Sequence, residues 1–300
     1  LILIEAGFDP TVIVGTKLKE FGPPAGGKNF RKGKSGYLVL EADEWKAAFH
    51  HYSPFVAPIT NIDAEHLDFY KTFTNVKKSF EKFKSQCHKI VERPKDEKLK
   101  MKIAKLLKVP GEHNIQNALN AYALADYLKV PEKTILHALG KYRGAWRRME
   151  YRGKLKIKNE KLKINVEASI FDDYAHHPSE IKATLQGFRQ KWPKNALICV
   201  FQPHQGKRLK LLYNSFKTAF KDASRVVILP TYQVAGREAE KASKYDAKRL
   251  AQDIGATYVS NPEKDLRKVL MSLVSSAKFP VPIIVMMGAG TINDLTPKLL

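Results

Sequence analysis

The sequence contains little cysteine and no long apolar segment. Cys87 and Cys199 are its only two cysteines, which gives neither a disulfide framework nor a metal-binding spacing. Cys199 lies inside an apolar run, 197–201, and is most simply a small buried hydrophobic side chain. No run approaches the roughly 20 apolar residues that cross a bilayer, and no basic segment followed by an apolar one opens the chain as a secretory leader would. We therefore expect a cytoplasmic protein without membrane insertion.

Acidic residues are scarce relative to basic ones. The sequence has 30 Asp and Glu against 52 Lys and Arg, a formal charge of +22, and residues 71–108 hold 13 basic but only 4 acidic residues. The electric field of such a positive charge attracts polyanions, but it does not distinguish nucleic acid, anionic membrane and phosphorylated small molecules. A solvated lysine surface explains it equally well. Because the basic residues are not interleaved with base-stacking aromatics, a nucleic-acid-binding protein is kept only as an alternative.

Short apolar runs alternate with helical periodicity along the chain. Runs that are apolar on both faces suit buried parallel strands, and strands alternating with helices predict an α/β layered fold. The expected strands lie at 37–40, 58–62, 168–171, 197–201, 226–229 and 283–287.

Helical periodicity is clearest over 115–128 and 181–188. The Lys-rich segment 95–108 carries an apolar stripe and is predicted as a basic amphipathic helix rather than a linker. A helical pattern ends near 144–150, and a polar stretch poor in strand signals, 152–163, follows it. We therefore expect two domains, residues 1–146 and 147–300.

Polar residues and glycines gather where the expected strands end. In open α/β sheets, ligands bind outside the carboxyl ends of the strands. One Asp or His after a strand is usually a turn former or a helix cap, but recurrence after several strands predicts a site. The residues are Glu41; Asp63, Glu65, His66 and Asp68; Asp172, Asp173, His176 and His177; Gln202, His204 and Arg208; and Gly288, Ala289 and Gly290.

Several of these segments resemble motifs of the Mur ligase family. The segment 172–178, Asp-Asp-Tyr-Ala-His-His-Pro, is similar to a family signature almost letter for letter. Six other segments resemble family motifs in the same order along the chain, with Glu65 replacing the usual Asp in the second of them. They are 41–44 (Glu-Ala-Asp-Glu), 60–68, 111–118, 144–150, 201–204 (Phe-Gln-Pro-His) and 288–290.

The resemblance implies a partial Mur-ligase-like central ATPase domain followed by a C-terminal Rossmann-like α/β domain. It also implies an ATP- and Mg²⁺-dependent ligase that phosphorylates a carboxylate and then lets an amine attack the acyl phosphate. The His-His pair and the Phe-Gln-Pro-His segment favour the family member that adds L-alanine to UDP-N-acetylmuramate in peptidoglycan precursor synthesis. A related ligase that attaches recycled muropeptides is the alternative within the family. Neither reading fixes the oligomeric state.

The resemblance also assigns roles to individual residues. Glu41 and His66 are expected to bind the metal and take part in catalysis, although imidazole favours softer metals than Mg²⁺ and His66 could instead be structural. His204 and Arg208 are expected to face the amino acid and the acyl phosphate. The residues expected to bind the nucleotide are Asn114, Asn117, Arg148, Asp173 and His176. For two of these an ordinary structural role stays open: Asn114 as the N-cap of a helix beginning at Ile115, and Arg148 as an interdomain salt bridge.

Two departures from the family pattern carry expectations of their own. The Gly-x-x-Gly-Lys-Thr/Ser loop that cradles the phosphates is absent, and the segment that follows it in relatives begins at Gly7. We therefore expect a truncated front end and no ligase activity from the chain alone. Gln205 stands where the family usually has Arg, which leaves substrate contact there open. A decayed, non-catalytic protein is a third alternative.

Overall fold

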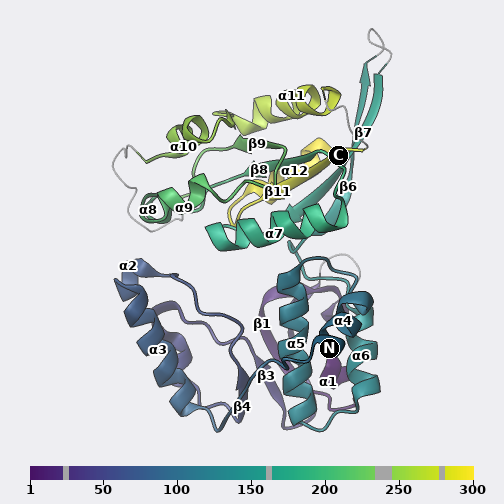
Figure 1. Cartoon of the computed structure of the whole chain (residues 1–300), viewed down its shortest axis with the longest axis vertical. Coiled ribbons are helices and arrows are strands. Elements are labelled where there is room, and N and C mark those ends of the chain that lie inside the picture. Colours follow the sequence, from purple (N-terminus) through teal and green to yellow (C-terminus); the bar gives the residue numbers. More distant parts are fainter. Residues whose placement is uncertain (23–26, 160–163, 234–244, 277–280) are drawn as a thin grey trace. The chain divides into compact units, whose positions relative to one another are not determined.

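A computed structural model describes residues 1–22, 27–159, 164–233, 245–276 and 281–300 (Figure 1). The chain divides into two compact units, Leu1–Trp146 (unit 1) and Arg147–Leu300 (unit 2). No helix among the described residues is long and apolar enough to span a bilayer.

Unit 2 is built on a six-stranded sheet with the strand order β10-β9-β8-β11-β7-β6. Every neighbouring pair is parallel except β6 and β7, which form an antiparallel hairpin. The strands are β6 (Glu150–Asn159), β7 (Ile164–Asp173), β8 (Leu197–Phe201), β9 (Arg225–Ile228), β10 (Thr257–Tyr258) and β11 (Ile283–Met287).

Helices cover both faces of this sheet, so its central strands are apolar on both sides. Cys199 and Phe201 of β8 pack in one core with α7 (Pro178–Lys191), α8 (Gly206–Leu211), α9 (Tyr213–Lys217) and α10 (Ala247–Asp253). Ile198 and Val200, which point the other way, pack in a second core with α11 (Pro262–Ser275) and α12 (Ile292–Leu299). Figure 1 shows α7 and α11 on opposite faces. This two-sided burial confirms the expected α/β fold.

The polar stretch 152–163 was predicted to be poor in strand, and that prediction is wrong. Residues up to Asn159 belong to β6, which pairs along its whole length with β7. Leu155 and Ile157 are buried, whereas Lys154 and Lys156 between them are exposed. Because β6 is an antiparallel strand with one solvated face, its apolar residues alternate with lysine. A search for continuous apolar runs therefore passes over it.

Unit 1 contains two small sheets. In the first, with the order β2-β1-β3, strand β1 (Thr11–Leu18) pairs antiparallel with β2 (Lys28–Arg31) and parallel with β3 (Leu38–Leu40). In the second, β4 (Val56–Pro58) pairs parallel with β5 (Lys89–Val91). The expected strand at 58–62 is thus displaced, because the paired residues are Val56–Pro58 and residues 59–62 have no strand pairing.

The helices of unit 1 pack in two cores. One core joins α1 (Ile2–Glu5), α4 (Glu97–Leu106), α5 (Glu112–Tyr127) and α6 (Glu132–Lys141). The other joins the 3-10 segment η2 (Trp45–His51), β4 and α3 (Phe73–Gln86) through Phe49, Ala57 and Phe83. The short elements η1 (Lys19–Phe21) and α2 (Leu67–Tyr70) complete the unit. Helix α4 confirms the predicted amphipathic helix within 95–108, with Ile103 fully buried.

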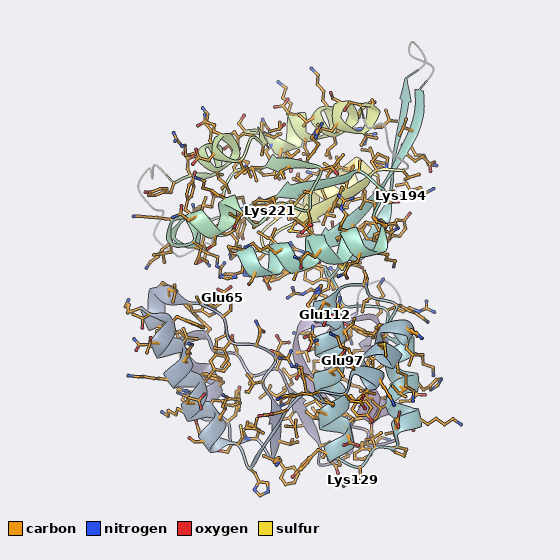
Figure 2. The ribbon with its side chains drawn as sticks, viewed as in Figure 1. Glu65, Glu97, Glu112, Lys129, Lys194 and Lys221 are labelled. Carbon is orange, nitrogen blue, oxygen red and sulfur yellow. The ribbon has the colours of Figure 1, made fainter. Side chains whose placement is uncertain are left out.

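Charged side chains lie on the surface of both units. Figure 2 shows Glu97, Glu112 and Lys129 of unit 1 and Lys194 and Lys221 of unit 2, and all five are exposed. The four cores of the two units hold apolar residues, whereas these charged side chains are solvated.

Candidate functional site

Four parallel strands of unit 2 end level with one another. Met287, the last residue of β11, is paired with Asp173 at the end of β7 and with Phe201 at the end of β8. Phe201 is paired in turn with Ile228 at the end of β9. The segments that follow these strands, including His176, His204 and Gly288–Gly290, therefore leave the sheet at one edge, where ligands bind in folds of this kind.

Asp173 is buried, and its carboxylate accepts three hydrogen bonds from the protein. One oxygen accepts hydrogen bonds from Ala175 N at 2.9 Å and Thr184 Oγ1 at 3.2 Å, and the other accepts one from Met149 N at 2.8 Å. Burial raises the pKa of Asp173, against the opposing charge of Arg148 and the two backbone N–H bonds. The carboxylate thus fixes the backbone at Met149, which follows Arg148, and at Ala175, which precedes His176.

Asp172 points to the other face of the sheet. Its Oδ1 accepts a 2.6 Å hydrogen bond from Thr296 Oγ1, and its Oδ2 lies 3.5 Å from Nε of Arg152. Burial raises the pKa of Asp172 from its ordinary 3.8 to about 6, although Thr296 and Arg152 oppose the shift. It therefore changes charge in a range where an ordinary aspartate would already be ionised.

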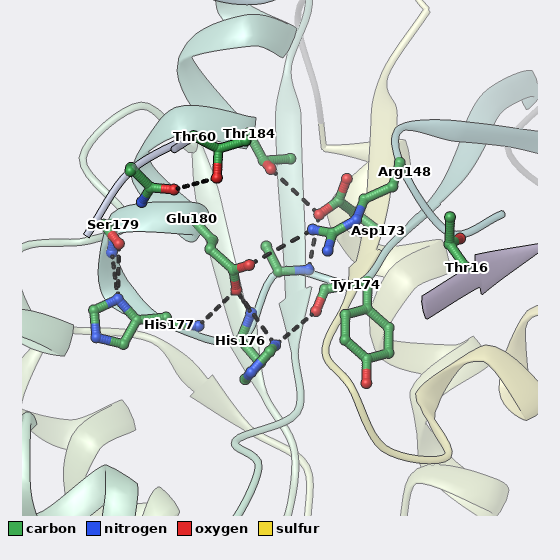
Figure 3. Close-up of polar contacts among 12 residues, drawn as sticks. Thr16, Thr60, Arg148, Asp173, Tyr174, His176, His177, Ser179, Glu180 and Thr184 are labelled. Atoms are coloured by element: carbon green, nitrogen blue, oxygen red, sulfur yellow. Dashed lines mark hydrogen bonds and ion pairs between the residues drawn. The ribbon is translucent and has the colours of Figure 1, made fainter. Parts of the chain in front are cut away.

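Glu180 holds together two of the predicted nucleotide-binding residues, as Figure 3 shows. Its carboxylate lies 3.6 Å from Nη1 of Arg148 and 3.3 Å from Nδ1 of His176. It also accepts the backbone N–H groups of His176 and His177 at 3.0 and 3.1 Å, which completes a capping box at the start of α7. The Arg148 guanidinium lies 5.3 Å from the centre of the Tyr174 ring. Arg148 and His176 are therefore held on one carboxylate beside an aromatic ring.

Four rings form a continuous row across the strand ends. Tyr174 meets His176 with centroids 5.4 Å apart, His176 meets His204 at 5.6 Å, and His204 stacks on Tyr232 at 5.4 Å with an interplanar angle of 19°. Arg208 Nη1 lies 3.3 Å from Nδ1 of His204. Because guanidinium can only donate, Nδ1 of His204 accepts in this contact and a neutral ring carries its proton on Nε2. The structure thus brings His176, His204 and Arg208 together.

The glycine turn after β11 is fixed from two sides. Arg147, only 3% exposed, donates to the carbonyl oxygens of Gly288 and Gly290, the latter at 3.2 Å. Gln202 Oε1 accepts from Ile292 N at 3.0 Å, and a Cβ added at Gly290 would lie 2.6 Å from that oxygen. Desolvation lowers the pKa of Arg147, although nearby acidic groups oppose it. A side chain at position 290 would therefore displace the turn.

The acidic segment of unit 1 provides a group of possible metal ligands. Ligand atoms of Asp43, Glu44 and His66 lie within 4.8 Å of one another, and Glu44 Oε1 is 3.3 Å from Nε2 of His66. Contact with His66 lowers the pKa of Glu44. Among the described residues Glu41 is not part of this group, and one of its carboxylate oxygens accepts the N–H of Gly15 at 2.7 Å.

The two predicted adenine-binding residues lie on one face of α5, because they are three positions apart. Asn117 is exposed, and Asn114 donates from its side-chain amide to Pro110 O at 2.6 Å. The alternative that Asn114 caps a helix beginning at Ile115 is wrong. The helix begins at Glu112 with Gly111 as its N-cap, whose φ of 103° suits glycine. Asn114 is therefore inside the first turn.

Sequence reasoning missed four residues of these sites: Arg147, Glu180, Tyr232 and Glu44. Glu180 had a signal, because a Glu three residues after an N-cap is the mark of a capping box. Glu44 lay inside a segment that had already been singled out. Arg147 lay inside the singled-out segment 144–150, but its contacts with Gly288 and Gly290 depend on residues far away in sequence. Tyr232 gave no signal, since it meets His204 only through the sheet register.

Comparisons with known proteins agree with the fold. Residues 2–105 match the family "Mur ligase middle domain", and residues 147–290 match "Mur ligase, glutamate ligase domain". The UDP-N-acetylmuramate–L-alanine ligase of Desulforapulum autotrophicum is 32% identical over 100% of this chain and 72% of its own length.

Two solved structures share the fold. The UDP-N-acetylmuramate-alanine ligase MurC of Thermotoga maritima has a TM-score of 0.72 and 24% identity, covering 99% of this chain and 70% of its own. The MurF ligase of Thermotoga maritima in complex with ADP has a TM-score of 0.63 and 12% identity, covering 99% of this chain and 74% of its own. The chain belongs to the Mur ligase family.

Proposed function

We propose that this chain is a ligase that joins L-alanine to the carboxylate of UDP-N-acetylmuramate with consumption of ATP, a step in peptidoglycan precursor synthesis. The relative with this name is similar over the whole chain. The observation that carries the proposal is the gathering of His176, His204 and Arg208 at the carboxyl edge of the unit 2 sheet, with Arg148 held beside them by Glu180. A cytoplasmic location is part of the proposal.

The reaction consists of two displacements. Transfer of the γ-phosphoryl group of ATP to the carboxylate gives an acyl phosphate and ADP, and attack by the amine of L-alanine then forms the amide and expels phosphate. Such chemistry depends on positioning and on cationic groups at the moving phosphoryl group. Arg208 supplies a cation and contacts Nδ1 of His204, so the Nε2–H of that ring is directed away from Arg208. We assign these two residues to the acyl phosphate and the amino acid.

Arg148 and His176 are assigned to the nucleotide phosphates. Arg148 is 48% exposed, so its guanidinium can reach a ligand while Glu180 keeps it in place. Asp173 is assigned an indirect part, because its buried carboxylate holds the N–H of Met149 next to Arg148. Asn114 and Asn117, on one face of α5, are assigned to the adenine edge.

The donor set Asp43, Glu44 and His66 fits a divalent cation, since two carboxylates supply the hard oxygens that Mg²⁺ prefers. The imidazole also admits Mn²⁺. A bound cation would neutralise phosphate charge during transfer. Glu41, three residues before Glu44, is retained as a further ligand in the proposal, on the family resemblance alone.

The test of function is ATP-dependent phosphate release with UDP-N-acetylmuramate and L-alanine, serine, glycine or a recycled muropeptide. It is run on the chain alone and on the chain joined to the N-terminal region of the Desulforapulum autotrophicum ligase. Stimulation by L-alanine that is lost in His204→Ala and Arg208→Ala supports the proposal. Lys207→Ala, an exposed neighbour on the same helix, is the matched control. Stimulation by the muropeptide only would identify the recycling ligase instead.

The metal assignment is tested by Mn²⁺ binding to the chain, followed by electron paramagnetic resonance. Glu44→Gln weakens binding if Asp43, Glu44 and His66 form the site, and Glu41→Gln weakens it if the family resemblance is right. Glu81→Gln, an exposed glutamate of α3, is the control for loss of one negative charge.

A further inference from the structure

We propose that Tyr232 is a positioning residue that fixes the orientation of His204. The inference rests on the proposed function, in which His204 contacts the reacting groups. Tyr232 lies beyond the end of β9 and belongs to none of the segments that the sequence singles out.

The backbone places Tyr232 beside His204. The pairing between β8 and β9 continues past the ends of both strands as an isolated parallel bridge between these two residues. Tyr232 N donates to Pro203 O at 2.8 Å, and Gln205 N donates to Tyr232 O at 2.9 Å. These two backbone hydrogen bonds fix the distance between the two residues independently of the contact between their rings.

The Tyr232 ring is confined between His204 and the glycine turn. It stacks on the imidazole at 5.4 Å with an angle of 19°. A Cβ added at Gly290 would lie only 2.5 Å from Cγ of Tyr232 and 2.7 Å from its Cβ, so the backbone of the turn packs directly on the tyrosine. Because Arg147 holds that turn through the carbonyl oxygens of Gly288 and Gly290, the tyrosine cannot withdraw from His204 without disturbing it.

Three side chains therefore contact the imidazole of His204, each at a different part of the ring. Tyr232 covers a face, the His176 ring meets it at 5.6 Å and 63°, and Arg208 reaches Nδ1 at 3.3 Å. An imidazole turns about two torsions, and a ring held this way keeps one orientation, with Nε2 directed away from Arg208. Side chains that act on reacting atoms need such support, because a displacement of about 1 Å can cost roughly 100-fold in rate.

The experiment compares Tyr232→Leu, which removes the stacking ring, with Tyr232→Phe, which keeps it. The first measurement is the proton resonances of the His204 imidazole in the chain itself, assigned by their loss in His204→Gln. Ring current from Tyr232 shifts these resonances, so they move in Tyr232→Leu and stay in place in Tyr232→Phe. Trp192→Leu, which removes a half-buried aromatic at the end of α7, is the matched control and leaves them unchanged.

The second measurement is ligase activity of the chain joined to the N-terminal region of its relative. We expect kcat to fall by about 10- to 100-fold in Tyr232→Leu, with little change in KM for ATP and with activity retained in Tyr232→Phe and Trp192→Leu. Unmoved His204 resonances or an unchanged kcat in Tyr232→Leu would overturn the proposal. Tyr232→Thr replaces Tyr232→Leu if that variant does not fold. If the unsubstituted enzyme is inactive with every amino acid, the proposed function fails, while the resonances still test whether Tyr232 orients His204.

Discussion

Arg148 forms an ion pair with Glu180 in the first turn of helix α7, with Nη1 and Oε1 3.6 Å apart. The same carboxylate accepts the backbone N–H groups of His176 and His177, which no helical carbonyl can satisfy at this end of the helix. Burial raises the pKa of Glu180, but the charges of His176 and Arg148 and the two backbone bonds outweigh it, and the net shift is downward. One glutamate thus caps a helix and orients two residues assigned to the nucleotide.

Glu180→Ala is expected to destabilise unit 2 by about 1–2 kcal/mol, because it removes the reciprocal half of a capping box. Glu180→Gln is expected to lose less stability, since the amide oxygen of glutamine still accepts the backbone N–H groups of His176 and His177. Urea denaturation measures both. The control is Glu263→Ala in the first turn of α11, whose carboxylate makes an exposed ion pair with Lys298. Equal losses in Glu180→Ala and Glu263→Ala would contradict the capping role.

The strands that sequence predicted well are those buried on both faces. The runs 197–201 and 283–287 coincide with β8 and β11, because a central strand between two helical layers is apolar at every position. The alternating strand β6 was missed for the opposite reason. Pairing of β6 with β7 decides its structure, and that pairing depends on residues beyond the local window.

The position of the site in the fold was predictable from the sequence, because the topology of a parallel sheet brings the carboxyl ends of its strands together whatever side chains follow them. Contacts within it were not predictable. Tyr232 reaches His204 only because β8 and β9 are in one register. Likewise Glu44, and not Glu41, neighbours His66, and the chain just after Glu44 turns through Lys46 and Ala47 at positive φ values of 51° and 59°. No sequence pattern indicates that conformation for these two residues.

Asp172→Asn is expected to change how stability depends on pH. The folded-state pKa of Asp172 is raised to about 6, so the folded protein binds this proton more tightly than the unfolded chain does. Ionisation of Asp172 therefore costs stability as pH rises from about 4 to 6, by roughly 3 kcal/mol for a shift of about two units. The free energy of unfolding of Asp172→Asn, relative to that of the unsubstituted protein, should therefore rise by about 3 kcal/mol between pH 4 and pH 7.

Denaturant unfolding at pH 4, 5, 6 and 7 measures this difference. Glu167→Gln is the control, with the opposite sign expected. Because Lys154 lowers the pKa of Glu167, ionisation of Glu167 stabilises the folded protein, and Glu167→Gln becomes less stable relative to the unsubstituted protein as pH rises. A difference between Asp172→Asn and the unsubstituted protein that stays constant with pH would show that Asp172 has an ordinary pKa.

Gly290→Ala is expected to destabilise unit 2 by about 1–3 kcal/mol, because the added methyl group would overlap Tyr232 and Gln202 in a turn held by Arg147. Gly140→Ala is the matched control. Gly140 lies in helix α6, where a Cβ meets nothing closer than 3.9 Å, and alanine there should stabilise unit 1 by about 0.5–1 kcal/mol. Thermal unfolding of the two variants should therefore shift in opposite directions. A neutral Gly290→Ala would mean that the turn can move away from Tyr232.

Leu38→Lys is expected to reduce self-association of the chain without loss of stability. Leu38, Ile13 and Phe30 lie on one face of the β2-β1-β3 sheet, as the register pairs Thr11 with Leu38 and Ile13 with Phe30. They are 59%, 43% and 48% exposed, and β3 is one of the two edge strands of this sheet among the described residues. Exposed apolar edges associate with other chains, and a lysine on the edge opposes this.

Sedimentation velocity over a range of concentrations measures the association, and urea unfolding checks that stability changes by less than about 0.5 kcal/mol. Leu211→Lys is the matched control, because Leu211 on α8 is 53% exposed but does not lie on this face. A general effect of one added charge on a protein that already carries +22 would act equally in both variants. A specific effect of the apolar sheet face requires that Leu38→Lys alone lowers the weight-average sedimentation coefficient. Association that persists in Leu38→Lys would place the contact on another surface.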